Sequence, residues 1–329
     1  MEKLKRKTMK LLRDYIPALK YGAKILPNDM AGMIGLPYVG NIIYVDPTSG
    51  SDTANGGGAQ NDALATVAAA YEKATSAQHD VVIIAPTGGT GRTAETSAIT
   101  WAKRFTHLIG NAAPVVQDNR AGIGFSTGGS LTISENGCMF KNLTMFSSAD
   151  IDVTVTLSGN YNSFSGVDFK GNSNATSIGS TPWRALKLSA AEENYFGGCT
   201  FGGDTYLRSA ANANIEFAST GNARNVFEDC LFSIRTDDAD ALFIKAASAA
   251  QIDRFAWFKN CFFHNTMESG STTMTIGMSI HAAVGGTVVL DGCSIHGVTN
   301  WSDDYTTVYG MNMPDVTAAN AGFLEKITT

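Results

Sequence analysis

The sequence has few charged residues, few prolines and no long hydrophobic run. Charged side chains make up 16% of the 329 residues, against about 25% in a typical globular protein. No apolar stretch approaches the roughly 20 residues that a membrane-spanning helix needs. The first residues also lack the continuous apolar region of a signal peptide. We therefore expect no membrane span and no signal peptide, and a structure rich in tight turns, since glycine is frequent at 34 residues.

Cysteine is also scarce, and its spacing argues against disulfide bonds. Four of the five cysteines, Cys199, Cys230, Cys261 and Cys293, follow one another at intervals of 31, 31 and 32 residues. This regularity predicts that they share one inward-facing position of a repeating unit, where a free thiol behaves as a small hydrophobic group. We expect a core row of unpaired cysteines and folding in a reducing compartment, with Cys138 outside the row.

The cysteines belong to a short phrase that recurs along the chain. The phrase reads apolar, polar, small, then Cys, Val or Leu, then any residue, then apolar, as in Phe-Lys-Asn-Cys-Phe-Phe at 258–263. Its first residues are separated by 24, 32, 31, 31 and 32 positions, and they are Phe140, Phe164, Phe196, Phe227, Phe258 and Leu290. A repeat of this length predicts a solenoid.

Alternation of apolar and polar residues within each unit indicates short strands with one buried face. A second alternating run precedes each phrase, for example Val153–Leu157 and Leu242–Ile244. One unit then forms one coil of a parallel β-helix, with coils stacked about 4.8 Å apart. A β-sandwich or jelly roll is the alternative, but it gives no reason to keep a phrase at a fixed interval.

Charge is distributed unevenly between the N-terminus and the rest of the chain. Residues 1–24 carry eight basic and two acidic side chains, a net +6, so the remainder carries −12. We interpret residues 1–41 as a basic arm and linker that dock on an acidic protein surface. The predicted docking residues are Lys3, Lys5, Arg6, Lys7, Lys10 and Arg13. A solvated helix is the alternative, and the arm lacks a motif for specific nucleic-acid recognition.

The segment at 42–86 resembles a known family. Ile43–Asp52, Gly56–Gly58, Ala63–Ala74 and Asp80–Pro86 are similar to the N-terminal module of pectate-lyase-like right-handed β-helix proteins. That layout is common in phage tailspikes and other phage surface proteins. The resemblance implies a helix over about 63–77, N-capped by Asp62, that covers the open end of the solenoid.

The fold expected from repeat and resemblance is all-β, a right-handed parallel β-helix with an N-terminal capping helix and a basic arm. Its predicted parts are the arm and linker at 1–41, a capping module at 42–100, coils at 101–297 and a C-terminal tail at 298–329 that covers the last coil.

The resemblance implies a phage virion surface protein, and we expect a non-enzymatic, homotrimeric capsid decoration protein assembled in the host cytoplasm. The arm would bind the major capsid protein or another virion protein. No cofactor, metal or catalytic residue is predicted. The alternatives are a tailspike-like polysaccharide lyase or hydrolase, and a module that binds a host surface glycan.

Four other sequence patterns contain residues of types that occur in binding or catalytic sites. Gly89-Thr-Gly91-Arg-Thr-Ala94 follows an apolar run but precedes no helix pattern, so we interpret it as a turn. His264 and His296 occupy equivalent positions and predict a surface ladder, with metal binding as the alternative. The acidic loops are interpreted as solvated rather than as a carboxylate pair; they contain Asp237, Asp238, Asp240, Asp303 and Asp304. The tryptophans are candidate sugar-stacking platforms or interface residues; they are Trp101, Trp183, Trp257 and Trp301.

Overall fold

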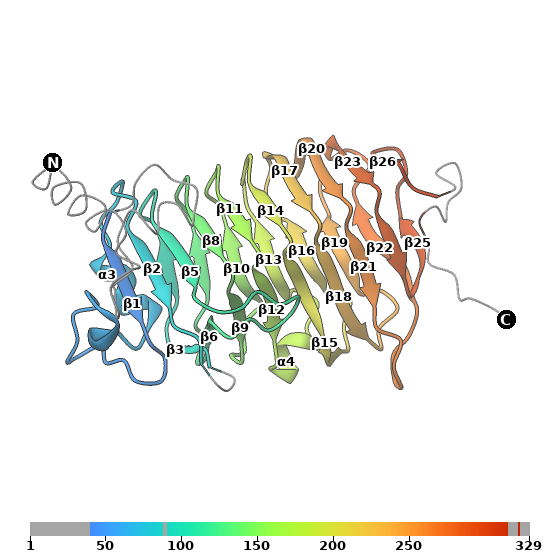
Figure 1. Ribbon diagram of the computed structural model, residues 1–329. Coiled ribbons are helices and arrows are strands. Elements are labelled where there is room, and N and C mark those ends of the chain that lie inside the picture. The colour runs from blue at the N-terminus through green and yellow to red at the C-terminus, as the bar shows by residue number, and fades with distance from the viewer. Residues whose placement is uncertain (1–39, 88–90, 315–321, 323–329) are drawn as a thin grey trace, which may run out of the picture.

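The computed structural model describes residues 40–87, 91–314 and 322. They form one elongated solenoid whose strands stack in chain order from the blue to the red end in Figure 1. The predicted right-handed parallel β-helix is confirmed. The six predicted docking residues of the arm, between Lys3 and Arg13, lie outside the described residues. Within the described ranges, no helix is long and apolar enough to cross a membrane.

Three parallel sheets, here called A, B and C, form the walls of the solenoid. Sheet A has ten strands, β1 Ile42–Val45, β2 Val81–Ile84, β5 His107–Gly110, β8 Met139–Lys141, β11 Ser163–Ser165, β14 Tyr195–Gly197, β17 Asn222–Glu228, β20 Ile252–Lys259, β23 Gly285–Asp291 and β26 Val308–Met311. Sheet B has eight strands, β3 Thr93–Glu95, β6 Gly122–Phe125, β9 Thr144–Ser147, β12 Asp168–Asn172, β15 Thr200–Arg208, β18 Leu231–Thr236, β21 Phe262–Asn265 and β24 Ser294–His296. Sheet C has eight strands, β4 Ile99–Trp101, β7 Leu131–Ile133, β10 Val153–Leu157, β13 Arg184–Leu188, β16 Ala213–Phe217, β19 Leu242–Ala246, β22 Met274–Ile280 and β25 Val298–Ser302.

The recurring phrase places stacked phenylalanines inside the solenoid. The first phenylalanine of the phrase pairs in register from coil to coil, and the rings are nearly parallel with centroids 4.9, 4.8, 4.6 and 4.7 Å apart. This row consists of Phe140, Phe164, Phe196, Phe227 and Phe258. Each fully buried ring contributes about 1.5–3 kcal/mol through removal of apolar surface from water. The row therefore forms a continuous core along the solenoid axis.

The small third residue of the phrase has a conformational cause. At this position the chain turns from sheet A to sheet B with φ between 52° and 62°, a left-handed conformation favoured by Gly and tolerated by Asn and Asp. The residues there are Asn142, Gly166, Gly198, Asp229, Asn260 and Gly292. A larger side chain at this bend would strain the turn before every inward cysteine.

A row of buried asparagines connects neighbouring coils beside the strands of sheet A. Asn194 Oδ1 accepts a hydrogen bond from the backbone N–H of Asn162 at 2.9 Å, and Asn225 Oδ1 accepts one from the N–H of Asn194 at 3.1 Å. Asn162 Oδ1 in turn accepts from the N–H of Cys138 at 2.8 Å. Because these backbone groups are buried, the amides satisfy donors that would otherwise destabilise the fold.

The N-terminal end is capped by a shorter helix than the sequence predicted. Helix α3 spans Val67–Lys73 and its N-cap is Thr66, whose hydroxyl accepts from the N–H of Ala69 at 3.1 Å. The assignment of Asp62 as N-cap was wrong, because Asp62 ends the short 3-10 helix η2, Gln60–Asp62. The chain is then extended at Leu64, which forms a parallel bridge with Val45. Helix α3 packs on the first coil, where Tyr71 stacks on Trp101 at 4.2 Å.

The boundaries of the coils also differ from the expected ones. Strands β1 to β4 lie in the same three sheets as the later strands, so the coils begin within the capping module at Ile42. At the other end, β25 pairs with β22 and β26 pairs with β23, which extends the coils beyond 297 to Met311. The phrase is lost there because β26 is an edge strand, largely exposed, with no described coil above it to bury an apolar row. A second short helix, α4 Ala175–Ile178, follows β12.

Candidate functional site

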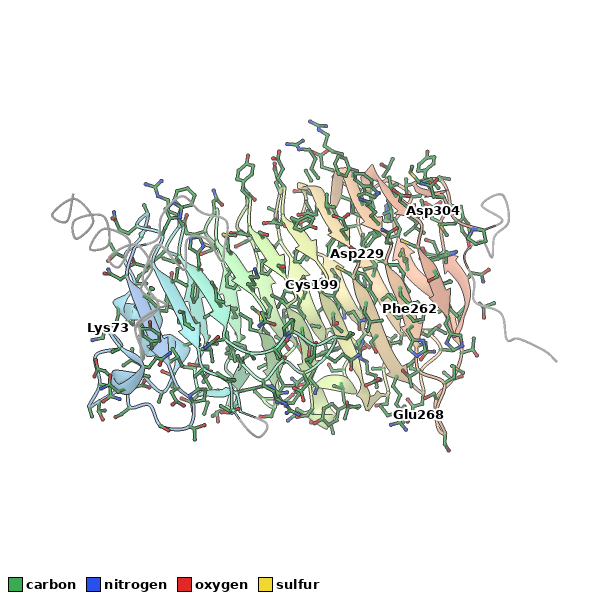
Figure 2. The ribbon with its side chains drawn as sticks, viewed as in Figure 1. Lys73, Cys199, Asp229, Phe262, Glu268 and Asp304 are labelled. Atoms are coloured by element: carbon green, nitrogen blue, oxygen red, sulfur yellow. The ribbon has the colours of Figure 1, made fainter. Side chains whose placement is uncertain are left out.

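The cysteine row lies inside the solenoid. Cys199, Cys230, Cys261 and Cys293 are free and no more than 2% exposed, and Figure 2 labels Cys199 near the middle of the ribbon. The thiol of Cys230 donates to the carbonyl of Phe196 at 3.3 Å. Burial raises the pKa of the Cys230 and Cys261 thiols. Because the thiolate is the reactive form, these groups serve packing rather than nucleophilic chemistry.

The two histidines singled out in the sequence lie side by side on the outer wall of sheet B. His264 pairs with His296 in register, and their rings stack at 5.1 Å. Burial, followed by the positive charge that His296 acquires on protonation, lowers the pKa of His264. In residues 40–87, 91–314 and 322, no group of three or more His, Cys, Asp or Glu side chains is arranged to hold a metal ion.

The carboxylates of the acidic loops accept hydrogen bonds from backbone N–H groups and form no paired-carboxylate site among the described residues. Asp238 accepts from the N–H of Asp240 at 2.8 Å, and Asp304 accepts from the N–H of Thr306 at 2.9 Å. Asp303 accepts from the N–H of Ile280 at 2.8 Å. Acidic side chains are also spread over the molecule, since Asp304 lies near the upper edge in Figure 2 and Glu268 near the lower edge.

Three of the four tryptophans are core residues, so the prediction of sugar-stacking platforms was wrong for them. Trp101, Trp183 and Trp301 are at most 3% exposed. Trp101 lies under the capping helix, and Trp301 packs edge-on against Phe263 at 5.4 Å near the C-terminal end. The ends of a solenoid need large apolar side chains to close the core. Trp257 alone is half-buried on an outer face.

Trp257 belongs to an apolar stripe on the outer face of sheet A. Strand register places its members directly above one another on β14, β17, β20, β23 and β26. The stripe consists of Tyr195, Val226, Trp257, Val289 and Tyr309. Tyr195 is 40% exposed and Tyr309 55% exposed, and the other three are half-buried. The stripe thus runs parallel to the solenoid axis over the C-terminal half.

Polar side chains lie two residues beyond the stripe on its three middle strands, β17, β20 and β23. Glu228 accepts from the Tyr195 hydroxyl at 2.9 Å and pairs with Lys259 Nζ at 2.6 Å. Asp291 accepts from the side-chain amide of Asn312 at 2.7 Å. Glu228 and Lys259 therefore neutralise each other beside the stripe, whereas Asp291 is paired with an uncharged amide.

A long loop lies on the outer wall of sheet B. This loop, here called the strap, comprises residues 111–121 between β5 and β6. Thr200 Oγ1 on β15 donates to the carbonyl of Val116 at 2.5 Å, across 84 positions of sequence. Asn119 Nδ2 donates to the carbonyl of Gly166 at 3.2 Å. The strap is therefore attached to strands that lie several coils away in the sequence.

A buried carboxyl group lies beneath the strap. Asp168 on β12 is 1% exposed, and its Oδ2 accepts from the backbone N–H of Asp118 at 2.7 Å. Its other oxygen, Oδ1, is buried and has no hydrogen-bond partner among the described residues. Burial raises the pKa of Asp168 to about 7, and the opposing effects of the Asp118 N–H, Lys170 and Arg92 are smaller. Asp168 therefore retains its proton in mildly acidic solution.

Three basic side chains surround the carboxylate of Asp118 on the strap. Lys170 Nζ lies 3.3 Å and Arg120 Nη1 lies 4.0 Å from Asp118 Oδ2, and Arg92 Nη2 contacts Oδ1. Arg92, Arg120 and Lys170 lower the pKa of Asp118 against the effect of its own desolvation. We call Arg92, Asp118, Arg120, Asp168 and Lys170 the strap cluster. No sequence pattern predicted it, because its members come from different coils.

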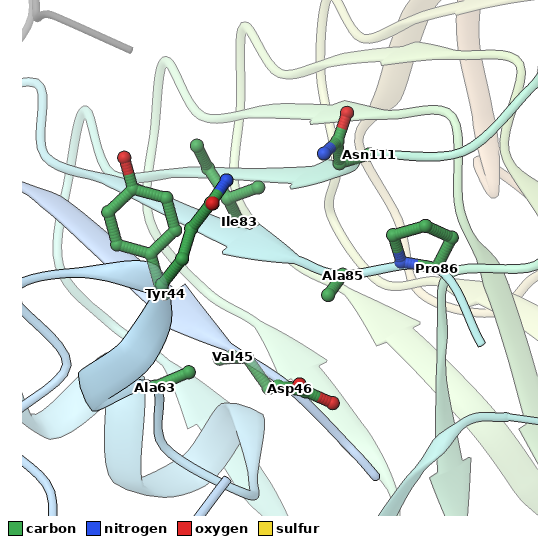
Figure 3. Close-up of a pocket in the computed structure, with 9 residues that line it drawn as sticks. Tyr44, Val45, Asp46, Ala63, Ile83, Ala85, Pro86 and Asn111 are labelled. Carbon is green, nitrogen blue, oxygen red and sulfur yellow. The ribbon is translucent and has the colours of Figure 1, made fainter. Parts of the chain in front are cut away.

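A separate pocket opens near the N-terminal end of sheet A. It has a volume of about 250 Å³, and Figure 3 shows Tyr44, Ile83 and Asn111 among the side chains that line it. Its one carboxylate, Asp46, accepts hydrogen bonds from the N–H groups of Thr48 and Ser49. The described lining residues include no basic side chain. The strap cluster therefore offers more varied chemistry than this pocket.

Comparison with known proteins identifies the fold. No protein-family model matches the chain, and no curated protein matches its sequence. Similar solved structures include a pectin methylesterase variant in complex with a hexasaccharide, with a TM-score of 0.51, 15% identity and coverage of 85% of this chain and 86% of that chain. Pectin methylesterase PemA from Erwinia chrysanthemi has a TM-score of 0.50 and 14% identity, and the match covers 85% of this chain and 86% of that chain. Pectate lyase Pel9A has a TM-score of 0.48 and 14% identity, and the match covers 84% of this chain and 72% of that chain. At this identity the first two likenesses establish a shared β-helix fold.

Proposed function

We propose that this chain is a non-enzymatic structural protein of a bacteriophage virion surface, a homotrimeric capsid decoration protein. The observation that carries the proposal is the apolar stripe on the outer face of sheet A. Its five side chains are partly exposed and directly adjacent in register, and such an apolar patch marks an interface. A stripe parallel to the axis is covered along its whole length when identical solenoids associate with parallel axes.

The charge distribution supports attachment through the N-terminal arm. Residues 1–24 carry a net +6 and the remaining chain carries −12. A basic segment of this kind binds an acidic protein surface by electrostatic complementarity. In the proposed assembly the arm binds the major capsid protein or another virion protein, while the solenoids associate through the stripe.

Deletion of residues 1–24 tests the attachment. We expect the truncated protein to keep the β-sheet circular dichroism and melting temperature of the full chain, because the coils begin at Ile42. Incorporation into particles is expected to fall below detection by immunoblotting of purified virions. Normal incorporation of the truncated protein would contradict the role of the arm.

A second candidate function is the binding or processing of an acidic polysaccharide, such as a host surface glycan. The observation that favours it is the strap cluster, with two carboxyl groups beside Lys170 and Arg92 on a fold also adopted by pectin methylesterases. Perturbed carboxyl groups beside cations occur frequently in active sites.

Incubation with pectin, polygalacturonate and alginate distinguishes the two functions. Release of methanol or of unsaturated uronates that is lost in Asp168→Asn would support the second candidate. The structural proposal predicts no product from any of the three polymers.

A further inference from the structure

The strap cluster contains more positive than negative charge around a single carboxylate. Arg92, Arg120 and Lys170 converge on Asp118, whereas Asp168 is buried beside them and holds its proton below about pH 7. In mildly acidic solution the cluster therefore has three cations and one ionised carboxylate. Such an excess is unusual on a chain with a net charge of −6, and it creates a local potential that attracts anions.

Two of the cations belong to the wall and are largely buried, and Arg92 also has a contact other than the one with Asp118. The Arg92 guanidinium lies over the Phe146 ring, 4.5 Å from its centroid, and its side chain is 12% exposed. Lys170 is on β12, and its side chain is 16% exposed. The Nε of Arg92 is buried and has no hydrogen-bond partner within the described part of the chain. The wall thus positions the cations, and Arg92 retains an unused donor.

Asp118 reaches these cations from the strap rather than from the wall. Its backbone has φ of 61°, in the left-handed region that side chains other than Gly, Asn and Asp rarely adopt. This conformation lets Asp118 donate its N–H to Asp168 while its carboxylate contacts the cations. Its side chain remains 32% exposed and that of Arg120 57% exposed, so solvent reaches one side of the cluster.

We propose that Arg92, Arg120 and Lys170 form a binding site for an oxyanion, and that Asp118 occupies this site as an internal substitute for the ligand. The ligand is an anion with carboxylate, phosphate or sulfate oxygens, since arginine and lysine donors bind all three. An external anion binds when its oxygens replace those of Asp118. The site is independent of the proposed virion role, because it lies on sheet B and the stripe lies on sheet A.

The substitution Asp118→Asn in the full chain tests the proposal. It removes the competing charge but keeps an amide of similar shape, so the three cations lose their internal anion. At low ionic strength and pH 6, we expect isothermal titration calorimetry to show at least about tenfold tighter binding of the preferred probe than in the wild type, which corresponds to about 1.4 kcal/mol. The probes are inorganic phosphate, inorganic sulfate and a galacturonate trimer, and their ranking distinguishes tetrahedral anions from sugar carboxylates.

Two controls assign the effect to the site. Adding Arg120→Gln to Asp118→Asn should return the affinity to the wild-type level, and Asp238→Asn, which alters an acidic turn elsewhere, should not change it. A folded Asp118→Asn protein with unchanged affinity for all three probes overturns the proposal. If that variant does not fold, hydrogen exchange of the wild-type strap decides. Faster exchange of the amides at 111–121 with phosphate or a galacturonate trimer, at constant ionic strength, supports displacement of Asp118, and unchanged exchange overturns it.

Discussion

The inner and outer faces of the same strands follow different rules. On β12, Phe169 points inward and stacks on Phe201 of the next coil at 5.0 Å, whereas the adjacent Asp168 lies outside under the strap. Inside, every coil presents a similar shape to the next, and the side chains repeat. Outside, in-register neighbours need not be alike, and Thr200, Leu231 and Phe262 differ in character. The interior therefore determines the fold, and the binding features belong to the outer wall.

The largest expected effect comes from breaking an inner row. Phe227→Ala removes a ring that stacks on Phe196 at 4.6 Å and on Phe258 at 4.7 Å. We expect the free energy of unfolding to fall by about 3–5 kcal/mol, because the cavity cannot close between fixed coils. Urea denaturation measures the loss. The outward Tyr195→Ala is the matched control, and an equal loss in both variants would contradict the distinction between the faces.

The free energy of unfolding is expected to depend on pH because of Asp168, the buried carboxyl group of the outer wall. The folded-state pKa of Asp168 is raised from 3.8 to about 7, so the folded state binds more protons than the unfolded chain between these values. The contribution of Asp168 to the free energy of unfolding is fully present below pH 3.8 and is lost as the pH rises to about 7. His107 has the opposite effect on the free energy of unfolding. Burial lowers its pKa to about 4, so its contribution to stability increases as the pH rises.

Asp168→Asn isolates the effect of Asp168. Relative to wild type, the free energy of unfolding of this variant should rise between pH 4 and pH 7, by up to a few kcal/mol. The size of the rise depends on the neighbouring charges, because they change the free-energy cost of ionising Asp168 in the folded state. Urea denaturation across this range measures the difference, with the exposed Asp237→Asn as control. Parallel stability curves for wild type and Asp168→Asn would show that Asp168 titrates normally.

The asparagine row sharpens the comparison with a smaller effect. Asn194→Ala removes the acceptor for the N–H of Asn162 and leaves buried polar groups without partners. We expect a loss of about 1–3 kcal/mol in the free energy of unfolding. Asn300→Ala is the control, because its side-chain amide makes only a 3.5 Å contact near the surface. A loss below about 0.5 kcal/mol for Asn194→Ala would mean that water replaces the amide.

The stripe is expected to affect association rather than folding. Trp257→Glu places a charge in the middle of the apolar stripe, and we expect association between copies to weaken at least tenfold, or about 1.4 kcal/mol. Sedimentation velocity measures the change, with Thr156→Glu on sheet C as control. The melting temperature of the dissociated protein should stay near that of the wild-type chain at low concentration. Unchanged assembly of Trp257→Glu would remove the stripe from the interface.

Features that repeat could be predicted from the sequence, and features that join distant coils could not. The spacing of Phe196, Phe227 and Phe258 predicted the solenoid because each coil places the same side chain at the same position of the core. The asparagine row carried the same signal, at intervals of 32 and 31 from Asn162 to Asn225. The strap lacked any such signal, since the contact between Val116 and Thr200 depends on three-dimensional stacking.

End effects account for several of the remaining errors of prediction. Trp101 and Trp301 were candidate sugar-stacking platforms or interface residues in the sequence analysis. They are buried because the first and last coils need large side chains to close the core. Similarly, Asp62 precedes an alanine-rich run, but the bridge between Val45 and Leu64 delays the helix until Val67. Sequence periodicity describes the interior coils and fails where stacking begins and ends.

Cryo-electron microscopy of virions that carry the full chain tests the central claim most directly. The account predicts trimers on the capsid, with the outer face of sheet A turned toward the three-fold axis and Trp257 buried between copies. It also predicts density for the basic arm against the capsid protein. Single solenoids, density at the tail, or trimers with Trp257 facing solvent would contradict the account.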